Sequence, residues 1–486
     1  MRNVFIQYQN TTLFSTNDDS NQSHIILNTI RFVKNNSLDR GIPYFRANRL
    51  IFVHHQWNGI DFLMCDESKS PEVLLYQLQL VYDISIFLFG NKLGLLKDDT
   101  ISLQLFKVLD RYVKGLLELF SYDMKSMIGS ASHDSSYSYR SQRLNSMIPS
   151  SGFPLDLGFV ECLIFYQHRI IARIGDKNHI STSTDVFCLS VFERIEYPTG
   201  PDESCNKLID PNYVTQRSPS NVKHLSGFIC IDDYHQKCSI ASTRLSEGGS
   251  YTILFITKSS HAENRDIIMN ILGLITVSLM DIESKPLSQV CIIPPSVVYY
   301  LAINRSNGIV WEETSCDQFE SCDVLKVIIK NMIQNTLPVI YAGKLSYLWN
   351  DGMFCFSYEL KFEDSEGNLV EPRPNGFEII NQYEPDQVLS YDYFIDCLFP
   401  QESGISLFQI FSIYISSPNL HECITVNRQL FEEFVRIHKS KLVHQSDLQK
   451  PRERRASNPV SHNHKFAPQQ FNPPKIILRS PTKRKQ

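Results

Sequence analysis

The stretch VVYYLAINRSNGIVWEET, residues 297–314, has the pattern of a β-hairpin. Its first arm, residues 297–303, is aromatic and β-branched, an Asn-Gly pair supplies a tight turn, and an apolar run then resumes. The same pattern begins at Val4 in VFIQYQNTTLFSTND and at Leu163 in LIFYQHRIIARIGD. A hairpin that recurs in this way predicts three structural units, each of which begins alike.

The units share one order of elements, β-β-α-β-β-β-α, which the first unit extends by a further helix. The first unit covers residues 1–121, the second residues 155–285 and the third residues 294–438. We therefore expect an α/β protein with three mixed five-stranded sheets, each flanked by helices. With 486 residues, of which 42% are hydrophobic, the chain is long enough to bury several cores.

Periodicity locates the elements within each unit. Alternating apolar and polar residues predict strands, and apolar residues at i, i+3, i+4 and i+7 predict helices. In the first unit, the strands after the hairpin are expected at 42–47, 50–57 and 60–66, and the helices at 23–35, Pro71–Phe89 and 101–120. In the second unit, the strands are expected at 227–234, 238–245 and 250–259, and the helices at Ser183–Glu196 and 260–280. In the third unit, a helix after Ser321 precedes a hairpin about Asp351 and Gly352, a strand at 405–415 and a helix from Ser417 to about Arg436.

Two segments stand apart by composition. Residues 126–151 hold ten serines in 26 positions, which predicts an unfolded Ser-rich linker over residues 122–154. Residues 439–486 hold 12 Lys and Arg against 2 Asp and Glu, so this tail has a charge of +10. The net charge of the chain is −5, so residues 1–438 together have a charge of −15. We expect the basic tail to be disordered, and an acidic body argues against a nucleic-acid-binding core. The cluster at 483–485 fits either a weak import signal or a patch that attracts lipid head groups.

The segment Pro71–Phe89 is apolar enough to require a membrane check. Gln77, Gln79 and Asp83 lie within it, and each is costly in hydrocarbon. The segment is preceded by Ser70, begins with Pro71 and is followed by Gly90, which are residues typical of the start and the end of a helix in a soluble protein. We therefore expect a helix that is buried on most sides. The 12 cysteines lie in apolar runs without C-x-x-C spacing, which predicts buried free thiols in a reducing compartment. We therefore expect a cytoplasmic chain.

The motif search predicts no catalytic residue, no cofactor and no metal. Phosphate-binding loops, dinucleotide-binding glycine patterns, H-E-x-x-H and G-x-S-x-G are all absent from the sequence. His54 and His55 are adjacent in a predicted strand and face opposite sides, so they cannot easily share a metal. His421 lacks a second histidine at helical spacing, and Asp232 lies in a predicted turn. The one candidate site is Ser457, a phosphorylation site that follows an Arg-Arg-Ala sequence.

The order of elements resembles that of a longin domain. Three such units in one chain resemble the tri-longin family, which comprises the Mon, Fuzzy and Hermansky–Pudlak syndrome proteins. The last third is most similar to the Hermansky–Pudlak syndrome branch, through VVYYLAINRSNGIVWEE, GMFCFSYELKFEDSEGN, and YDYFIDCLF followed by ISLFQIFSIYISSPNLHECI. For the first two units the resemblance is architectural, through GIDFLMCDESKSPEVLLYQLQLVYDISIFLFG and KHLSGFICIDD.

The resemblance implies a role without covalent chemistry. The chain would be one subunit of a heterodimeric guanine-nucleotide exchange factor for Rab GTPases, biogenesis of lysosome-related organelles complex 3. Its implied partner is a Hermansky–Pudlak syndrome type 4-like longin protein. Its implied place is the cytoplasm, with peripheral recruitment to endosomal or lysosome-related organelle membranes. Because exposed sheet edges in such units favour pairing with another domain, we expect an obligate protein partner and no nucleic acid.

Two other hypotheses stay open from the residues alone. The chain could be a non-catalytic tri-longin trafficking scaffold, similar to the Fuzzy effector of planar polarity and ciliogenesis. It could also be an enzyme with an unfamiliar site. The third unit fits the exchange-factor subunit better than the scaffold, and no clustered polar residues in the sequence favour an enzyme.

Overall fold

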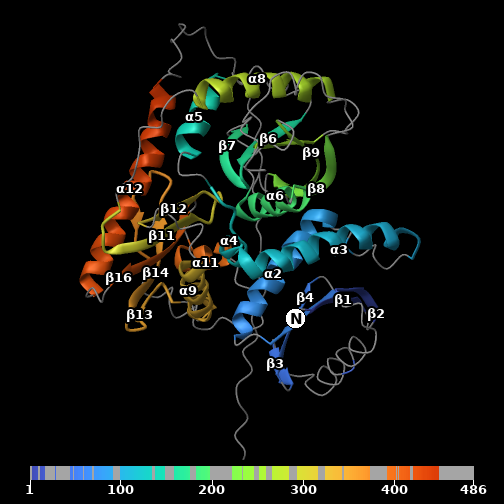
Figure 1. The fold of residues 1–486 in the computed structure, drawn as a ribbon, viewed down its shortest axis with the longest axis horizontal. Helices are drawn as coiled ribbons and strands as arrows, with labels where there is room; N and C mark the ends of the chain where they lie inside the picture. Colours follow the sequence, from blue (N-terminus) through green and yellow to red (C-terminus); the bar gives the residue numbers. More distant parts are fainter. Residues whose placement is uncertain are drawn as a thin grey trace, which may run out of the picture. The chain divides into compact units, whose positions relative to one another are not determined.

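The computed structural model describes most of residues 3–16, 44–90, 99–147, 158–197, 222–258, 265–283, 293–315, 323–372 and 391–447. Residues Met1–Lys441 form one compact unit, and Leu442–Gln486 form a second. Within residues Met1–Lys441, three sheets flanked by helices make a mixed α/β fold (Figure 1).

The three sheets have the same spatial order of strands. In the first sheet this order is β2 (Thr11–Ser15), β1 (Asn3–Tyr8), β5 (Ile60–Asp66), β4 (Leu50–Trp57) and β3 (Tyr44–Ala47). In the second it is β7 (Arg169–Gly175), β6 (Phe159–Tyr166), β10 (Tyr251–Thr257), β9 (Tyr234–Arg244) and β8 (Lys223–Ile231). In the third it is β12 (Val310–Thr314), β11 (Val297–Asn304), β16 (Ser406–Ile415), β14 (Phe354–Glu363) and β13 (Ser346–Asn350), with β15 (Leu369–Val370) beside β14. The three predicted hairpins are confirmed as the opening pair of each sheet.

The prediction of mixed sheets is wrong, because every pairing between the described strands is antiparallel. The cause is the path of the one long connection in each sheet. After its opening hairpin, the chain crosses from one edge of the sheet to the other, as from β2 to β3. The strands before and after this connection, such as β2 and β3, run in the same direction, but they lie at opposite edges and are not neighbours.

Among the described residues, helices cover one face of the first sheet and both faces of the second and third sheets. One face of the first sheet packs on α2 (Pro71–Phe89) and α3 (Asp99–Tyr122), one face of the second on α6 (Ser183–Glu196), and one face of the third on α9 (Asp323–Tyr341) and α11 (Tyr391–Leu398). These faces meet in a single hydrophobic cluster. The opposite faces of the second and third sheets pack separately, on α8 (Arg265–Glu283) and α12 (Leu420–Asp447). The helix expected at 23–35 lies outside the described residues.

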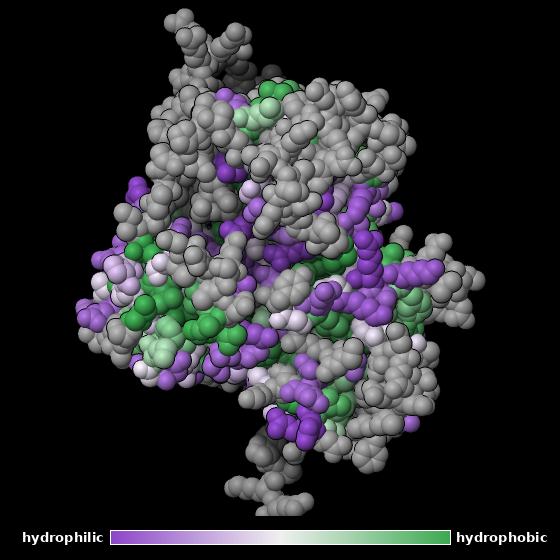
Figure 2. Space-filling view, viewed as in Figure 1, coloured by the Kyte–Doolittle hydropathy of each residue, from purple (hydrophilic) through white to green (hydrophobic). Residues whose placement is uncertain are grey.

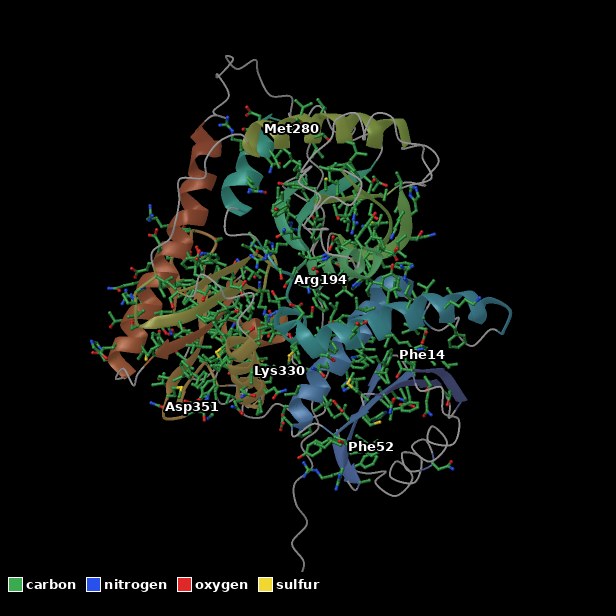
Figure 3. All side chains as sticks on the ribbon, in the orientation of Figure 1. Phe14, Phe52, Arg194, Met280, Lys330 and Asp351 are labelled. Atoms are coloured by element: carbon green, nitrogen blue, oxygen red, sulfur yellow. The ribbon has the colours of Figure 1, made fainter. Side chains whose placement is uncertain are left out.

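The third sheet confirms the hairpin expected about Asp351 and Gly352 (Figure 3). The Asp351 carboxylate accepts hydrogen bonds from the backbone N of Met353 at 2.9 Å and of Phe354 at 2.8 Å, which closes the turn. After the last strand, α12 continues beyond the expected end near Arg436 to Asp447, because no glycine or proline interrupts that stretch. The tail beyond Asp447 lies outside the described residues.

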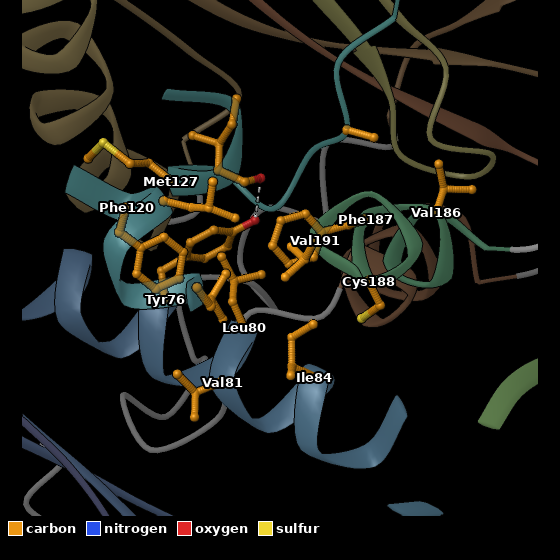
Figure 4. Packing of buried hydrophobic residues seen from close by; sticks show 14 of the residues in the cluster. Tyr76, Leu80, Val81, Ile84, Phe120, Met127, Val186, Phe187, Cys188 and Val191 are labelled. Carbon is orange, nitrogen blue, oxygen red and sulfur yellow. Dashed lines mark hydrogen bonds between the residues drawn. The ribbon is translucent and has the colours of Figure 1, made fainter. Parts of the chain in front are cut away.

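Helix α2 lies at the centre of the common cluster. It packs on β4 and β5 of its own sheet and also contacts α3, α6, α9 and β8. Figure 4 shows Tyr76, Leu80 and Ile84 of this helix close to Phe187 and Val191 of α6. Within the described part of the chain, α2 is the helix long and apolar enough to cross a membrane, but 67% of its apolar window is buried inside the protein. The prediction of a helix buried on most sides is confirmed.

Gln77 of α2 is fully buried without a hydrogen bond. Its side chain is 0% exposed, and neither its Oε1 nor its Nε2 has a partner among the described residues. An unpaired buried amide costs free energy, because it loses its hydrogen bonds to water and gains none in return. We therefore expect Gln77→Met to raise the free energy of unfolding by about 1–3 kcal/mol, as measured by chemical denaturation. Gln77→Glu, which adds a charge at the same place, should have the opposite effect, and a destabilising methionine would contradict the expectation.

The Ser-rich segment is folded, so the prediction that its composition cannot form structure is wrong. It contains α4 (Met124–Met127) and α5 (Tyr137–Met147), and residues 127–133 are buried. Ser141 Oγ donates a hydrogen bond to the carbonyl of Arg173 and accepts one from its backbone N, both at 3.0 Å. The carbonyl of Ser132 accepts from the backbone N of Ile170 at 2.7 Å. Both partners are on β7, so this segment covers an edge of the second sheet.

Candidate functional site

A cavity of about 590 Å³ lies between α2, α6, α11 and the turn that joins β11 to β12. Small-molecule sites usually have volumes of roughly 300–1,000 Å³, aromatic walls and a few convergent polar groups. This cavity has both features, because its wall includes several aromatic rings and the polar side chains of Gln79, Asp83, Asp185, His235, Arg305 and Ser306. All three sheets and their helices contribute residues to it.

One face of α2 forms the acidic side of the cavity. Gln79, Tyr82, Asp83 and Ile86 line it, and their i, i+3, i+4 and i+7 spacing places them on one side of the helix. The Nε2 of Gln79 donates to Oδ1 of Asp83 at 2.6 Å, which is the one hydrogen bond of that carboxylate in the described residues. The Oε1 of Gln79 has no hydrogen-bond partner there. Asp83 therefore has a single, neutral donor, and the buried Oε1 of Gln79 has none among the described residues.

The environment of Asp83 disfavours its ionised form. Burial raises the pKa of the Asp83 carboxyl to about 7, the hydrogen bond from Gln79 opposes this rise, and the negative charge of Asp185 adds to it. Asp185 is placed by the start of α6, where its Oδ2 accepts from the hydroxyl of Thr182 at 2.7 Å and from its backbone N at 3.1 Å. This capping box orients Asp185 at the cavity wall. Near neutral pH, Asp83 is therefore divided between its protonated and ionised forms.

An aromatic stack lies beside these carboxyl groups. Trp57 at the end of β4 and Tyr82 of α2 stack with ring centroids 4.3 Å apart and planes 13° apart, and both rings line the cavity. Phe62 packs edge-on against both rings, and His55 lies 4.1 Å from Trp57. Burial lowers the pKa of His55 to about 4, with a further contribution from His54, so this imidazole is neutral at physiological pH. The stacked rings of Trp57 and Tyr82 therefore present an aromatic surface to the cavity, and the neutral His55 beside them adds no positive charge.

Arg305, after β11, belongs to another wall of the cavity. Its guanidinium donates to the carbonyl of Ile128 at 2.9 Å, to the carbonyl of Gly129 at 3.3 Å, and from Nε to Oε1 of Gln409 at 2.9 Å. It also lies 4.8 Å from the ring centroid of Tyr391. All these bonds go to neutral oxygens. No ion pair joins Arg305 to Asp83, both of which the structure describes.

The candidate residues of the sequence analysis do not meet in this cavity. Ser457 and Asp232 lie outside the described residues, so the phosphorylation site stays a prediction. His54 is in β4, with its Nε2 2.9 Å from Oδ1 of Asp61, and His421 is exposed on α12. Among the described residues, no three His, Cys, Asp or Glu side chains are grouped to hold a metal. The described cysteines are free, and all but Cys397 are buried, which confirms that prediction for them.

The cavity itself was missed from the sequence. Its residues are scattered from Trp57 to Ile405, so no local spacing brings them together. The available signal was the set of polar residues Gln77, Gln79 and Asp83 in a mostly apolar helix, of which Gln79 and Asp83 line the cavity.

Two open sheet edges form a second candidate surface. In the second sheet, the edge strand β7 bonds to the Ser-rich segment and β8 contacts α2. Strands β3 and β13 also pair with a single strand each among the described residues, and their Tyr44 and Tyr347 are 45% and 41% exposed. The rings of Tyr347, Trp349 and Phe356 stack in a row that ends at the open side of β13. Figure 2 shows hydrophobic side chains gathered over the part of this face where α9 and β13 lie.

Comparison of the chain with protein-family models and with curated proteins found no match. The strand order shared by three sheets, the open edges of β3 and β13, and the cavity are therefore the features from which a function can be argued.

Proposed function

We propose that the chain is one subunit of a heterodimeric guanine-nucleotide exchange factor for Rab GTPases. Its role would be like that of the Hermansky–Pudlak syndrome type 1 protein within biogenesis of lysosome-related organelles complex 3. The observation that carries the proposal is the repetition of one strand order in three sheets. This repetition supports three longin-like domains for two reasons. The order of elements along the chain resembles a longin domain in each unit, and each unit forms its own sheet with the same spatial order of strands.

Nucleotide exchange needs binding energy rather than covalent chemistry. A GTPase holds GDP through Mg²⁺ and its phosphate loop, with the switch regions closed over the nucleotide. If the dissociation constant is on the order of 10⁻¹¹ M, about 15 kcal/mol opposes release. A protein that binds the open form of the switches better than the closed form shifts the population towards release. A broad platform built from the first domain and its counterpart in the other subunit can supply that difference.

The open edge of β13 is our proposed contact with the second subunit. The carbonyl of Leu345 accepts from the backbone N of Leu360 at 2.7 Å. This bond shows which residues of β13 direct their backbone N–H and C=O groups towards β14 and which direct them away from it. Since bonded residues alternate along an antiparallel strand, Tyr347 points its backbone groups at β14, and Leu348 points its own outward. β13 carries no charge and no proline to protect this edge. A strand of a longin-like partner can therefore extend the sheet here.

The test is co-expression of the full chain with type 4-like longin proteins, followed by release of fluorescent GDP from a panel of Rab GTPases. We expect a stable complex that accelerates release from at least one Rab at least roughly tenfold, equivalent to about 1.4 kcal/mol of barrier. Leu348→Pro removes an outward N–H and also the packing of the half-buried leucine on the core of the third sheet, so circular dichroism must first show that the variant is folded; the folded variant should weaken the complex. Met353→Ser, a change at a side chain 70% exposed in the adjoining turn, serves as the matched control.

Each outcome of this test has a distinct meaning. A stable complex that accelerates release from none of the Rab proteins would overturn the exchange activity and favour the tri-longin scaffold. A complex that is active and tolerates Leu348→Pro would keep the exchange activity but remove β13 from the interface. If no longin-like partner binds at all, the exchange-factor proposal and the scaffold alternative both fail.

A further inference from the structure

We propose that the cavity between α2, α6 and α11 binds an organic cation, an ammonium or guanidinium group carried on an apolar body. This site is separate from the open edge of β13, so the inference does not depend on the exchange activity.

No cationic side chain among the described residues pairs with Asp83 on the acidic side of the cavity. Asp83 has one hydrogen bond, from the neutral amide of Gln79 at 2.6 Å, and the Oε1 of that amide has no donor among the described residues. The neighbouring charge that acts on Asp83 is the carboxylate of Asp185, which repels rather than neutralises it. Asp83 is half-buried, and a carboxylate that is partly removed from water is stabilised by a cationic partner or by several donors. The missing component at this wall is therefore a positively charged donor.

The aromatic stack favours the same kind of ligand. Trp57 and Tyr82 line the same cavity as Asp83, and tryptophan and tyrosine rings attract cations through the negative charge of their faces. Phe87, Phe187 and Phe228 add apolar wall that would contact the body of the ligand. A volume of about 590 Å³ exceeds the needs of a bare metal ion, and the described residues offer no cluster of three metal ligands.

Arg305 does not make the cavity an anion site. Its guanidinium is already bonded to Gln409 and to the carbonyls of residues 128 and 129, and it is 8% exposed. An anion would instead meet Asp83 and Asp185 at close range, and like charges in a partly buried site repel strongly. Among the lining residues, two carboxylates therefore face one guanidinium whose donors are already used, and this negative balance favours a cationic ligand.

Binding should depend on pH through Asp83. A cation next to this carboxyl stabilises its ionised form, so binding displaces the proton that Asp83 holds at lower pH. Affinity should then rise as the pH increases through about 7 and level off above it. The other titratable or charged groups at the cavity are Asp185 and Cys188 on α6, His235 on β9, Arg305, and Tyr76, Tyr82 and Tyr391. Burial raises the pKa of Cys188 well above its ordinary value, so this thiol stays neutral.

The experiment uses the full chain and a permanently charged probe, benzyltrimethylammonium, titrated by isothermal calorimetry between about pH 6 and pH 8. We expect roughly tenfold tighter binding at the upper pH, since the ionised fraction of a carboxyl with a pKa of about 7 changes by that factor. Asp83→Asn keeps the shape of the site and should weaken binding at least tenfold while removing the pH dependence. His235→Gln should leave the pH dependence in place. Asp110→Asn, on the exposed surface of α3, is the matched control.

Ligand controls separate charge from shape. Benzyl alcohol and benzylsulfonate should bind at least tenfold more weakly than the cation. Nα-acetylarginine amide tests whether the basic side chain of another protein occupies the site as well as a free cation does. Circular dichroism confirms that each variant is folded, and Tyr82→Leu provides a second variant on the aromatic side. The proposal is overturned if the cation gives no saturable heat, if benzyl alcohol binds equally well, or if folded Asp83→Asn binds with unchanged affinity.

Discussion

Replacement of Glu312 by alanine is expected to lower the free energy of unfolding by about 3–5 kcal/mol. Glu312 lies on β12, and its carboxylate accepts hydrogen bonds from Nζ of Lys125 and, at 2.8 Å, from the hydroxyl of Tyr299. Lys125 belongs to α4 and is 7% exposed. Without Glu312, this buried ammonium group loses its ion-pair partner and keeps only the charge of Asp123, which already pairs with Arg194; that loss is more costly than the loss of one hydrogen bond. Chemical denaturation of the purified chain measures the change.

A double replacement separates the cost of an unpaired charge from the value of the pair. Lys125→Met together with Glu312→Leu removes both charges, and we expect its stability to lie within about 1 kcal/mol of the parent chain. The exposed pair of Arg428 and Glu432 on α12 provides the comparison, because Glu432→Ala should cost less than about 0.5 kcal/mol. If Glu312→Ala costs no more than Glu432→Ala, the ion pair does not hold α4 to the third sheet.

Elements with strong local signals could be predicted from the sequence. Helices α2 and α6 have the predicted bounds, because a proline or a capping box starts each one and a regular apolar face continues it. The opening hairpins were equally clear, since their turns and alternating arms are close in the chain. The direction of neighbouring strands was not predictable in this way, because it depends on a crossover between distant edges of each sheet.

The Ser-rich segment shows where composition fails. Average hydropathy treats its serines as solvated, whereas here they supply hydrogen bonds to an edge strand. Charged partners also come from far along the chain, as when Arg194 of α6 pairs with Asp123 at 2.8 Å and donates to Ser132 (Figure 3). Burial alone would raise the pKa of Asp123, but Arg194 and the hydrogen bonds from Ser126 outweigh it and hold the pKa below its usual value. No count of residue types foresees such pairings.

The domain boundaries drawn from the sequence stay predictions, and the common core explains why. Buried residues of all three sheets belong to one hydrophobic cluster, with α2 and the Ser-rich segment between them. Tyr76 of α2 donates to the carbonyl of Ile128 at 2.9 Å, the bond drawn in Figure 4. The same carbonyl accepts from Arg305 of the third sheet at 2.9 Å. One backbone oxygen in a supposed linker thus joins two units that the sequence separates by more than a hundred residues.

Arg305→Met is therefore expected to lower the free energy of unfolding by about 3 kcal/mol, the upper end of the cost when a buried acceptor loses its donor. The change removes the donors to Gln409, Ile128 and Gly129 and leaves these oxygens in the interior with fewer partners. A buried acceptor deprived of a donor loses more than the net value of a hydrogen bond, because water cannot replace the donor. The loss should be largest around residues 124–133, where amide hydrogen exchange will report faster opening.

Two further variants test this explanation. Arg305→Lys keeps the charge but not the fork of donors, so it should recover only part of the lost stability. Arg436→Met removes an exposed arginine of α12 and should change stability by less than about 0.5 kcal/mol. If Arg305→Met lowers stability without faster exchange in residues 124–133, the guanidinium supports the third sheet alone and does not connect it to the Ser-rich segment. If Arg305→Met speeds amide exchange only in residues 124–133 and in β7, the Arg305 side chain connects the third sheet to the Ser-rich segment and, through it, to the second sheet.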